Sequence, residues 1–139
     1  MNKVSQKIRK LILHARPVHC GEYSVDGAYI FTAGYDSVLN VICAYTGEVL
    51  EKYGPHLTST GTAISAMAVS SDCRYVCLGF KAERLVVHDR VEKTKTERVL
   101  DCRGVRAMAL TKDSSSLFVC TLCAEGEKTF SKVLKLSFP

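Results

Sequence analysis

The chain has no tryptophan, only three prolines and 8% aromatic residues among its 139 residues. Its few aromatic side chains fall mostly in apolar runs, which favours a protein core over a platform on which nucleic-acid bases stack. No apolar run approaches the ~20 residues that a membrane-spanning helix needs. The basic N-terminus also lacks the apolar segment of a secretory signal. We therefore expect a protein of the cytoplasm or nucleus that is neither secreted nor held in a membrane.

The sequence is also poor in motifs that bind cofactors or metals. It contains seven cysteines, and without an export signal we expect free thiols in a reducing compartment. Cys73 and Cys77, with Cys120 and Cys123, are spaced like zinc ligands, but the strands predicted there would keep four thiolates from converging on one ion. A redox role for the last two would need a helix, and no glycine-rich stretch has the spacing of a phosphate loop. The sequence therefore predicts no metal and no cofactor.

Positive charge is concentrated at the N-terminus. The net charge is +5, and residues 1–16 contain five basic residues and no acid, so the rest of the chain is balanced. A basic arm this short is usually a solvated terminus, which is the interpretation we favour. The alternative is contact with phosphate or an acidic partner, as in an RNA-binding component. The side chains that would make these contacts are Lys3, Lys7, Arg9 and Lys10.

Against these absences stands a regular pattern of short apolar segments. Residues 16–48 read RPVHCGEYSVDGAYIFTAGYDSVLNVICAYTGE. Turn residues, among them Asp26 and Gly27, separate runs that are rich in aromatic and β-branched residues. We predict four antiparallel strands, near residues 18–23, 29–32, 38–42 and 48–53.

The pattern repeats along the chain. An offset of 46 residues relates Asp26 to Asp72 and Leu39 to Leu85, and the segment from Val105 repeats again at a further offset of 41. Self-similarity at a period of about 40–45 residues is typical of β-propeller blades. For the second repeat we predict a charged turn over residues 91–97 and a strand over 98–102. For the third we predict a long turn over 123–129 and a strand over 133–138.

These residues resemble the WD-repeat β-propeller family. His14, Thr32 and Asp36 stand where WD repeats carry the His, the Ser or Thr and the Asp of a buried polar network. Ile42 stands in place of the family's Trp. The resemblance therefore implies a network that has lost one donor and is weakened or partly replaced by water.

The second repeat departs further from the family. His56 corresponds to the network's His, but Leu78 and Ala82 replace the hydroxyl and the Asp, and His88 replaces the Trp. The resemblance implies that apolar packing holds this repeat together.

His14, Thr32 and Asp36 also contain the residue types of a hydrolytic site. A catalytic trio needs a nucleophile that is open to a cleft, and nothing in the sequence indicates one. We favour the structural interpretation and expect no enzymatic activity.

The chain divides into a basic N-terminal arm (residues 1–13) and three blades (14–56, 57–101 and 102–139). The predicted fold is all-β, a partial propeller of three four-stranded WD-like blades, the last without its outer strand. Propellers close with at least four blades. The sequence is therefore a fragment, or docks on another chain that completes the propeller, or pairs with a second copy; we favour the first two. Residues 7–13 alternate like a strand and are a candidate outer strand for a blade outside this chain.

The family resemblance implies a function as well as a fold. WD propellers commonly bind proteins through loops, which vary while the blades hold position. We expect a non-catalytic scaffold for protein–protein interaction in an intracellular complex. Residues 16–56 and 105–138 are also similar to the WD-repeat i-subunit of eukaryotic translation initiation factor three and to WD-repeat proteins of small-ribosomal-subunit assembly. Residues 104–113 are similar to the terminal propeller of BEACH-domain proteins. The two ribosomal resemblances imply partners in translation initiation or ribosome assembly.

Overall fold

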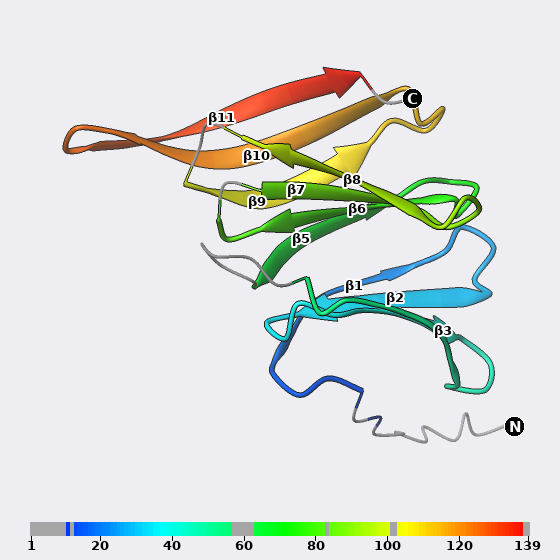
Figure 1. Cartoon of the computed structure of the whole chain (residues 1–139). Coiled ribbons are helices and arrows are strands. Elements are labelled where there is room, and N and C mark those ends of the chain that lie inside the picture. The colour runs from blue at the N-terminus through cyan, green and yellow to red at the C-terminus, as the bar shows by residue number, and fades with distance from the viewer. Residues whose placement is uncertain (1–10, 12, 57–62, 83, 101–102, 138–139) are drawn as a thin grey trace, which may run out of the picture.

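The computed structural model describes residues 11, 13–56, 63–82, 84–100 and 103–137. In this part of the chain eleven β-strands form three antiparallel sheets, and no helix occurs. Strands that are adjacent in sequence are hydrogen-bonded neighbours in each sheet. The sheets stack on one another in the order of the sequence (Figure 1). The predicted all-β fold is confirmed, with two sheets of four strands and a last sheet of three.

We call the sheets blades one, two and three. Blade one contains β1 (Val18–Tyr23), β2 (Tyr29–Gly34), β3 (Leu39–Cys43) and β4 (Val49–Tyr53). Blade two contains β5 (Ile64–Val69), β6 (Tyr75–Phe80), β7 (Arg84–Asp89) and β8 (Thr94–Val99). Blade three contains β9 (Gly104–Leu110), β10 (Ser116–Glu125) and β11 (Lys128–Ser137). The described residues include no helix long and apolar enough to cross a membrane.

The turn between the first two strands is built in the same way in every blade. A hydroxyl donates to an aspartate two residues later, in the pairs Ser24–Asp26 (2.6 Å), Ser70–Asp72 (2.7 Å) and Thr111–Asp113 (2.7 Å). The same hydroxyl accepts the backbone N–H that begins the second strand, at 3.0, 2.9 and 3.1 Å. Short polar side chains form such local bonds readily, which is why they recur at turns. This turn accounts for the aspartates at the repeated sequence positions.

Blades one and two pack face to face through an apolar core. Phe31 and Val41 of blade one and Leu78 and Phe80 of blade two are fully buried in it. Side chains alternate between the two faces of a strand, so these residues come from the faces that meet. Burying one such side chain stabilises the fold by about 1.5–3 kcal/mol relative to leaving it exposed.

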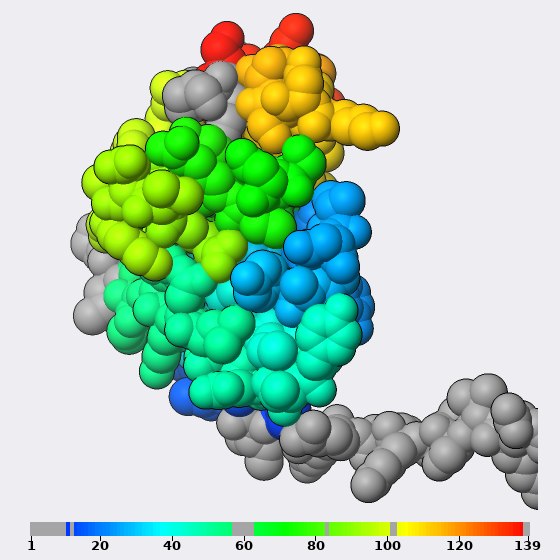
Figure 2. Space-filling model, turned by 90° about the vertical axis from the view of Figure 1, so that its right-hand side faces the viewer, coloured from blue at the N-terminus to red at the C-terminus, as the bar shows by residue number. Residues whose placement is uncertain are grey.

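A second core joins blades two and three. Leu85 of β7 packs there with Val105 and Leu117 of blade three. A Cβ atom at Gly79 would overlap the side chain of Val105, so this glycine permits the close approach of the two sheets. Blade two lies between the other blades, as the green layer in Figure 2 shows. It is covered on both faces, whereas each outer blade meets a described blade on one face only.

The outer strand of blade two begins earlier than the sequence indicated. The predicted turn over 91–97 and the predicted start of the strand at residue 98 are wrong, because β8 runs from Thr94 to Val99 and pairs with β7 along its whole length. Residues 101 and 102, where we predicted that strand to end, lie outside the described residues. All six residues of β8 are exposed. An outer strand needs no apolar face, so its charged composition resembled that of a loop.

The end of blade three also differs from the prediction. The predicted long turn over 123–129 is instead the tip of a long hairpin, in which β10 and β11 pair from Ser116–Ser137 to Glu125–Lys128. Gly126 adopts a φ of 63°, which suits the first position of a two-residue hairpin turn. The glycine and charged residues of this stretch indicated a turn correctly but not how tight it is. Residue 138, where we predicted the last strand to end, lies outside the described residues.

Candidate functional site

A cluster of polar side chains lies on blade one, on the face opposite the apolar core with blade two. His14 Nδ1 lies 2.9 Å and 3.1 Å from the carboxylate oxygens of Asp36, and its Nε2 lies 2.8 Å from Thr32 Oγ1. Asp36 also accepts from the backbone N–H groups of Ala15 and Val38, each at 3.2 Å. The three residues named from the sequence are therefore hydrogen-bonded to one another.

The proton positions on His14 follow from its neighbours. A carboxylate only accepts, so Nδ1 carries the hydrogen that it donates to Asp36. In the neutral tautomer Nε2 then accepts from the Thr32 hydroxyl. The arrangement resembles a hydrolytic trio, but only 2% of the His14 side chain is exposed, and both of its nitrogens are engaged. Catalysis would require a substrate to reach this imidazole through a cleft. The buried ring, with both nitrogens hydrogen-bonded, is instead suited to connecting residues 13–15 to the blade.

Asn40 joins this network, although the sequence analysis did not identify it. Its Nδ2 donates to Leu13 O at 3.1 Å and lies 3.4 Å from His14 Nε2. Asn40 is buried, and it stands on β3 two residues before Ile42, the position of the family's Trp. The sequence feature that could have identified Asn40 is its position, as a polar residue in the middle of an apolar run.

Blade two carries a different polar contact at the corresponding place. His56 Nδ1 lies 2.6 Å from Ser37 O, and His56 Nε2 lies 2.6 Å from His88 Nε2. Both histidines are buried where blades one and two meet. Our expectation of apolar packing alone in this blade was therefore incomplete.

This contact requires a neutral His56, and burial favours the neutral form of both rings. His56 Nδ1 donates to a carbonyl, so in the neutral ring its Nε2 is an acceptor, and His88 Nε2 must donate to it. Burial lowers the pKa of His56. Burial, followed by the neighbouring His56, lowers the pKa of His88 to about 4. Protonating both rings would place two cations in contact and remove the only acceptor between them.

An ion-pair cluster links the outer edges of blades one and two. Glu51 of β4 accepts from Arg90 and, at 3.0 Å, from Lys93 Nζ. Burial alone would raise the pKa of Glu51, but hydrogen bonds from Arg90, Tyr53 and Lys93 outweigh it and hold the pKa at about 2. Arg90 also donates to Cys73 O at 2.7 Å. The cluster therefore fixes the spacing of the two blades on the side away from β1 and β5.

The six described cysteines are present as thiols. No disulfide joins the described cysteines, and no group of three or more His, Cys, Asp or Glu side chains among the described residues could hold a metal ion. Burial raises the pKa of Cys77 to about 12 and that of Cys20 to about 11. These two thiols therefore stay protonated and unreactive near neutral pH.

The basic side chains predicted to contact phosphate or an acidic partner lie outside the described residues. These are Lys3, Lys7, Arg9 and Lys10. Their role stays a prediction.

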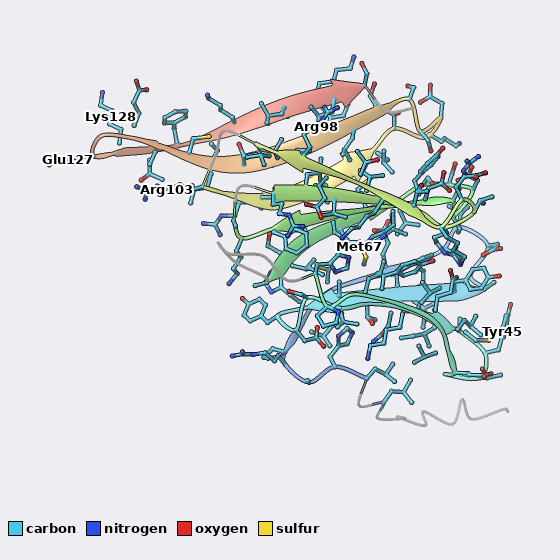
Figure 3. All side chains as sticks on the ribbon, viewed as in Figure 1. Tyr45, Met67, Arg98, Arg103, Glu127 and Lys128 are labelled. Atoms are coloured by element: carbon cyan, nitrogen blue, oxygen red, sulfur yellow. The ribbon has the colours of Figure 1, made fainter. Side chains whose placement is uncertain are left out.

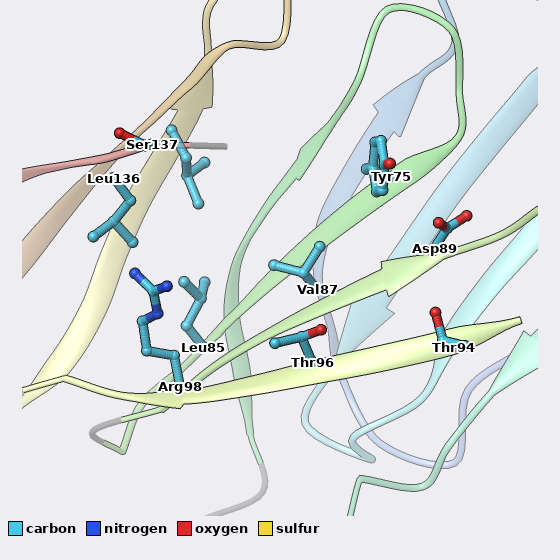
Figure 4. Close-up of a pocket in the computed structure, with 10 residues that line it drawn as sticks. Tyr75, Leu85, Val87, Asp89, Thr94, Thr96, Arg98, Leu136 and Ser137 are labelled. Carbon is cyan, nitrogen blue, oxygen red and sulfur yellow. The ribbon is translucent and has the colours of Figure 1, made fainter. Parts of the chain in front are cut away.

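A groove of about 330 Å³ separates the outer parts of blades two and three. Leu85 and Val87 of β7 line one wall, and Leu136 of β11 lines the other (Figure 4). Arg98 of β8 lies at one end and Asp89 at the other. The groove lies beside β11, which pairs with β10 on one edge and has no described strand on the other.

Solved structures show what this stack of blades is similar to. The WD40 repeats of RRP9 and the structure of U3-55K each match with a TM-score of 0.71 and 18% sequence identity, over 91% of this chain and 41% of theirs. The fold is that of a WD40 β-propeller. The β-propeller domain of Cps50 (Swd1) from Myceliophteria thermophila matches with a TM-score of 0.64 and 13% identity, over 84% of this chain and 39% of that one.

The likeness is one of fold. The chain spans about two fifths of the length of these WD40 proteins, which corresponds to three blades of a larger ring. No protein-family model and no curated protein matches the sequence.

Proposed function

We propose that this chain is a non-catalytic scaffold that mediates protein–protein interaction within an intracellular complex of the cytoplasm or nucleus. The observation that carries the proposal is the contrast between blade two, which is covered on both faces, and the outer blades. Large apolar side chains of the outer blades are exposed, with Tyr23 at 66% and Val133 at 66%, whereas those that blade two exposes, Val91 and Val99, lie at its outer edge. Exposed apolar surface of this kind marks interaction sites.

A partial propeller of this kind would take part of its stability from protein that covers the outer blades. On β10, Phe118 and Cys120 alternate with the buried Leu117 and Val119, so they lie on the face of blade three that points away from blade two. Val133 of β11 lies opposite Cys120 and shares this face. Protein packed on this face would bury it as the other interblade faces are buried, whether it belongs to another chain or to a longer form of this one.

The finer proposal is a complex of translation initiation or ribosome assembly. Its support is the resemblance of motifs within residues 16–56 and 105–138 to those of WD-repeat proteins of these complexes. Affinity purification of the tagged chain at low salt tests both the scaffold function and the finer proposal. Co-purifying proteins support the scaffold, and ribosomal or initiation proteins among them support the finer proposal. Loss of all partners from a Phe118→Asp/Val133→Asp variant that still folds would identify blade three as the docking face, and a chain that recovers no protein would contradict the scaffold.

An RNA-binding component is the second candidate, and the basic residues of positions 1–16 favour it. It predicts RNA binding that weakens as salt rises, because cations that neutralise phosphates release counterions. Replacing Lys3, Lys7, Arg9 and Lys10 by Ala should abolish that binding. Unchanged binding would exclude the arm as the RNA contact.

A further inference from the structure

Side chains from all three blades meet in a pocket of about 500 Å³ at one edge of the stack. Tyr35 comes from the turn after β2, and Lys81 from the turn after β6. Arg103 precedes β9, and Arg106 lies within it. Arg103 lies on the same side of the stack as the hairpin tip that carries Glu127 and Lys128 (Figure 3).

Backbone hydrogen bonds hold these residues in place. Tyr35 N donates to Pro17 O at 3.0 Å, and Lys81 N donates to Ala63 O at 3.0 Å, so equivalent positions of blades one and two carry them. Arg103 N donates to Leu122 O at 2.7 Å.

The neighbouring Gly104 packs directly against Lys81. A Cβ atom at Gly104 would collide with the carbonyl oxygen of Lys81. The turn of blade two and the start of blade three are therefore in contact, and this contact places Lys81 beside the residues that carry the two arginines.

The charges of the pocket are of one sign. Lys81, Arg103 and Arg106 line it, and none of the three forms an ion pair with a described residue. The described lining residues include no acid. The cations of blade two that are paired with carboxylates lie elsewhere: Arg74, Arg84, Arg90, Lys93 and Lys95. Three cations that converge on one hollow and have no ion-pair partner among the described residues favour an anionic ligand.

The aromatic ring in the pocket, that of Tyr35, already packs against two side chains. Lys81 Nζ lies 4.2 Å from the centroid of the Tyr35 ring and donates to its hydroxyl, and His19 stacks on the same ring at 5.3 Å between centroids. A nucleic-acid base would have to displace one of these neighbours to stack there. The floor instead offers two apolar side chains, the buried Val105 and the half-buried Leu122.

We propose that this pocket binds an acidic peptide segment of a partner protein, with its carboxylates on Lys81, Arg103 and Arg106 and one apolar side chain over Leu122. The guanidinium group matches a carboxylate with two parallel hydrogen bonds, which gives orientation as well as strength. The proposal rests on the scaffold function and names the chemistry of one of its partners.

The test measures fluorescence anisotropy of the full chain with a labelled eight-residue peptide of glutamate and aspartate around one central leucine. The pocket variant Lys81→Gln/Arg103→Gln/Arg106→Gln should bind it at least about tenfold more weakly. The control variant Lys52→Gln/Lys112→Gln/Lys135→Gln has the same net charge, and its exposed sites lie outside the pocket. The affinity of this control variant for the peptide should stay within about twofold of that of the unaltered chain. Circular dichroism confirms that both variants fold.

Three results would overturn the proposal. An equal loss in the pocket and control variants would show only general charge attraction. Absence of peptide binding by the unaltered chain would exclude the site, while partners recovered by affinity purification would still leave the scaffold function standing. A ten-nucleotide single-stranded RNA that binds more tightly than the peptide, and loses affinity in the pocket variant, would assign the pocket to RNA.

Two acidic residues next to the site in sequence, Glu83 and Asp101, lie outside the described residues. Replacing them provides a further test of the proposal. The double variant Glu83→Gln/Asp101→Asn should bind the acidic peptide as tightly as the unaltered chain or more tightly, since it removes negative charge. Weaker binding would contradict the assignment of the carboxylate contacts to the three cations.

Discussion

Blades one and two place a histidine at equivalent positions and hold it by opposite chemistry. In blade one, His14 donates to the carboxylate of Asp36. In blade two no described carboxylate bonds to the corresponding histidine, and His56 accepts from a second imidazole, His88. The first arrangement uses a charge, whereas the second loses its acceptor when His56 is protonated at Nε2. One repeat position can therefore tolerate different residues, but each solution has its own dependence on mutation and pH.

Removing the carboxylate should have the largest effect among the substitutions tested at pH 7. Asp36→Ala deletes the acceptor of His14 Nδ1 and of two backbone N–H groups, and leaves a buried imidazole donor without a partner. We expect a loss of about 3 kcal/mol in the free energy of unfolding. Urea denaturation at pH 7 measures it. Glu92→Ala removes an exposed carboxylate and should change stability by less than about 0.5 kcal/mol. Equal effects of the two changes would mean that the blade-one network contributes nothing.

Acid should lower the folding stability through the histidine pair His56 and His88. The folded-state pKa of His88 is about 4, below its ordinary value of 6.5, so between these pH values the unfolded chain binds more protons. The contribution of His88 is therefore complete above pH 6.5 and is lost as the pH falls towards 4, by roughly 3 kcal/mol. His56, whose pKa is also lowered, adds to the loss in the same direction.

His88→Gln isolates this effect, because glutamine keeps an N–H donor but does not titrate. Carboxylates titrate alike in both proteins, so the difference between their stability curves reports His88. We expect the curve of the variant to fall less than that of the unaltered chain between pH 6.5 and 4. Parallel curves would mean that His88 is not held neutral by the fold.

The ion pair between the blades should matter less. Glu51→Gln removes the charge that pairs with Arg90 and Lys93, and about 1 kcal/mol of stability should be lost at pH 7, since the cluster is partly exposed. The folded-state pKa of Glu51 is depressed to about 2. Its contribution is therefore present above pH 4.5 and disappears as the pH falls towards 2, below the window of the histidine pair. Denaturation at pH 7 in low and high salt checks this, and a salt-independent loss would count against an ionic contribution.

Replacing Asn40 should have an effect no larger than that of Glu51→Gln, and it also tests the difference between the blades. Asn40→Leu removes the hydrogen bond to Leu13 O and the contact with His14, but keeps the volume of the side chain. We expect a loss of about 1 kcal/mol, because one hydrogen bond is exchanged for apolar burial. Thermal unfolding at pH 7 measures it. No change would show that His14 needs only Asp36 and Thr32.

The architecture could be predicted because it is repeated. Asp26, Asp72 and Asp113 form the same local turn, which depends on residues within about five positions of one another. Local chemistry of that kind is visible in sequence. Outer strands were harder to place, since β8 is exposed on every residue and needs no apolar period.

The site was less accessible to sequence reasoning. The trio of His14, Thr32 and Asp36 could be named only through a family resemblance. The contact between His56 and His88 joins residues 32 positions apart, and it depends on how blade one stacks on blade two. The cationic pocket likewise draws on turns of three blades, so no single segment carries its pattern.

The central claim is that the outer blades of this WD40 stack are completed by other protein. The most direct measurement is the molar mass of the tagged chain isolated from cell extract, by light scattering. The account predicts a species well above the 15.3 kDa of the chain that contains at least one other protein. A stable, uniform species with the mass of a single tagged chain and no bound protein would contradict it.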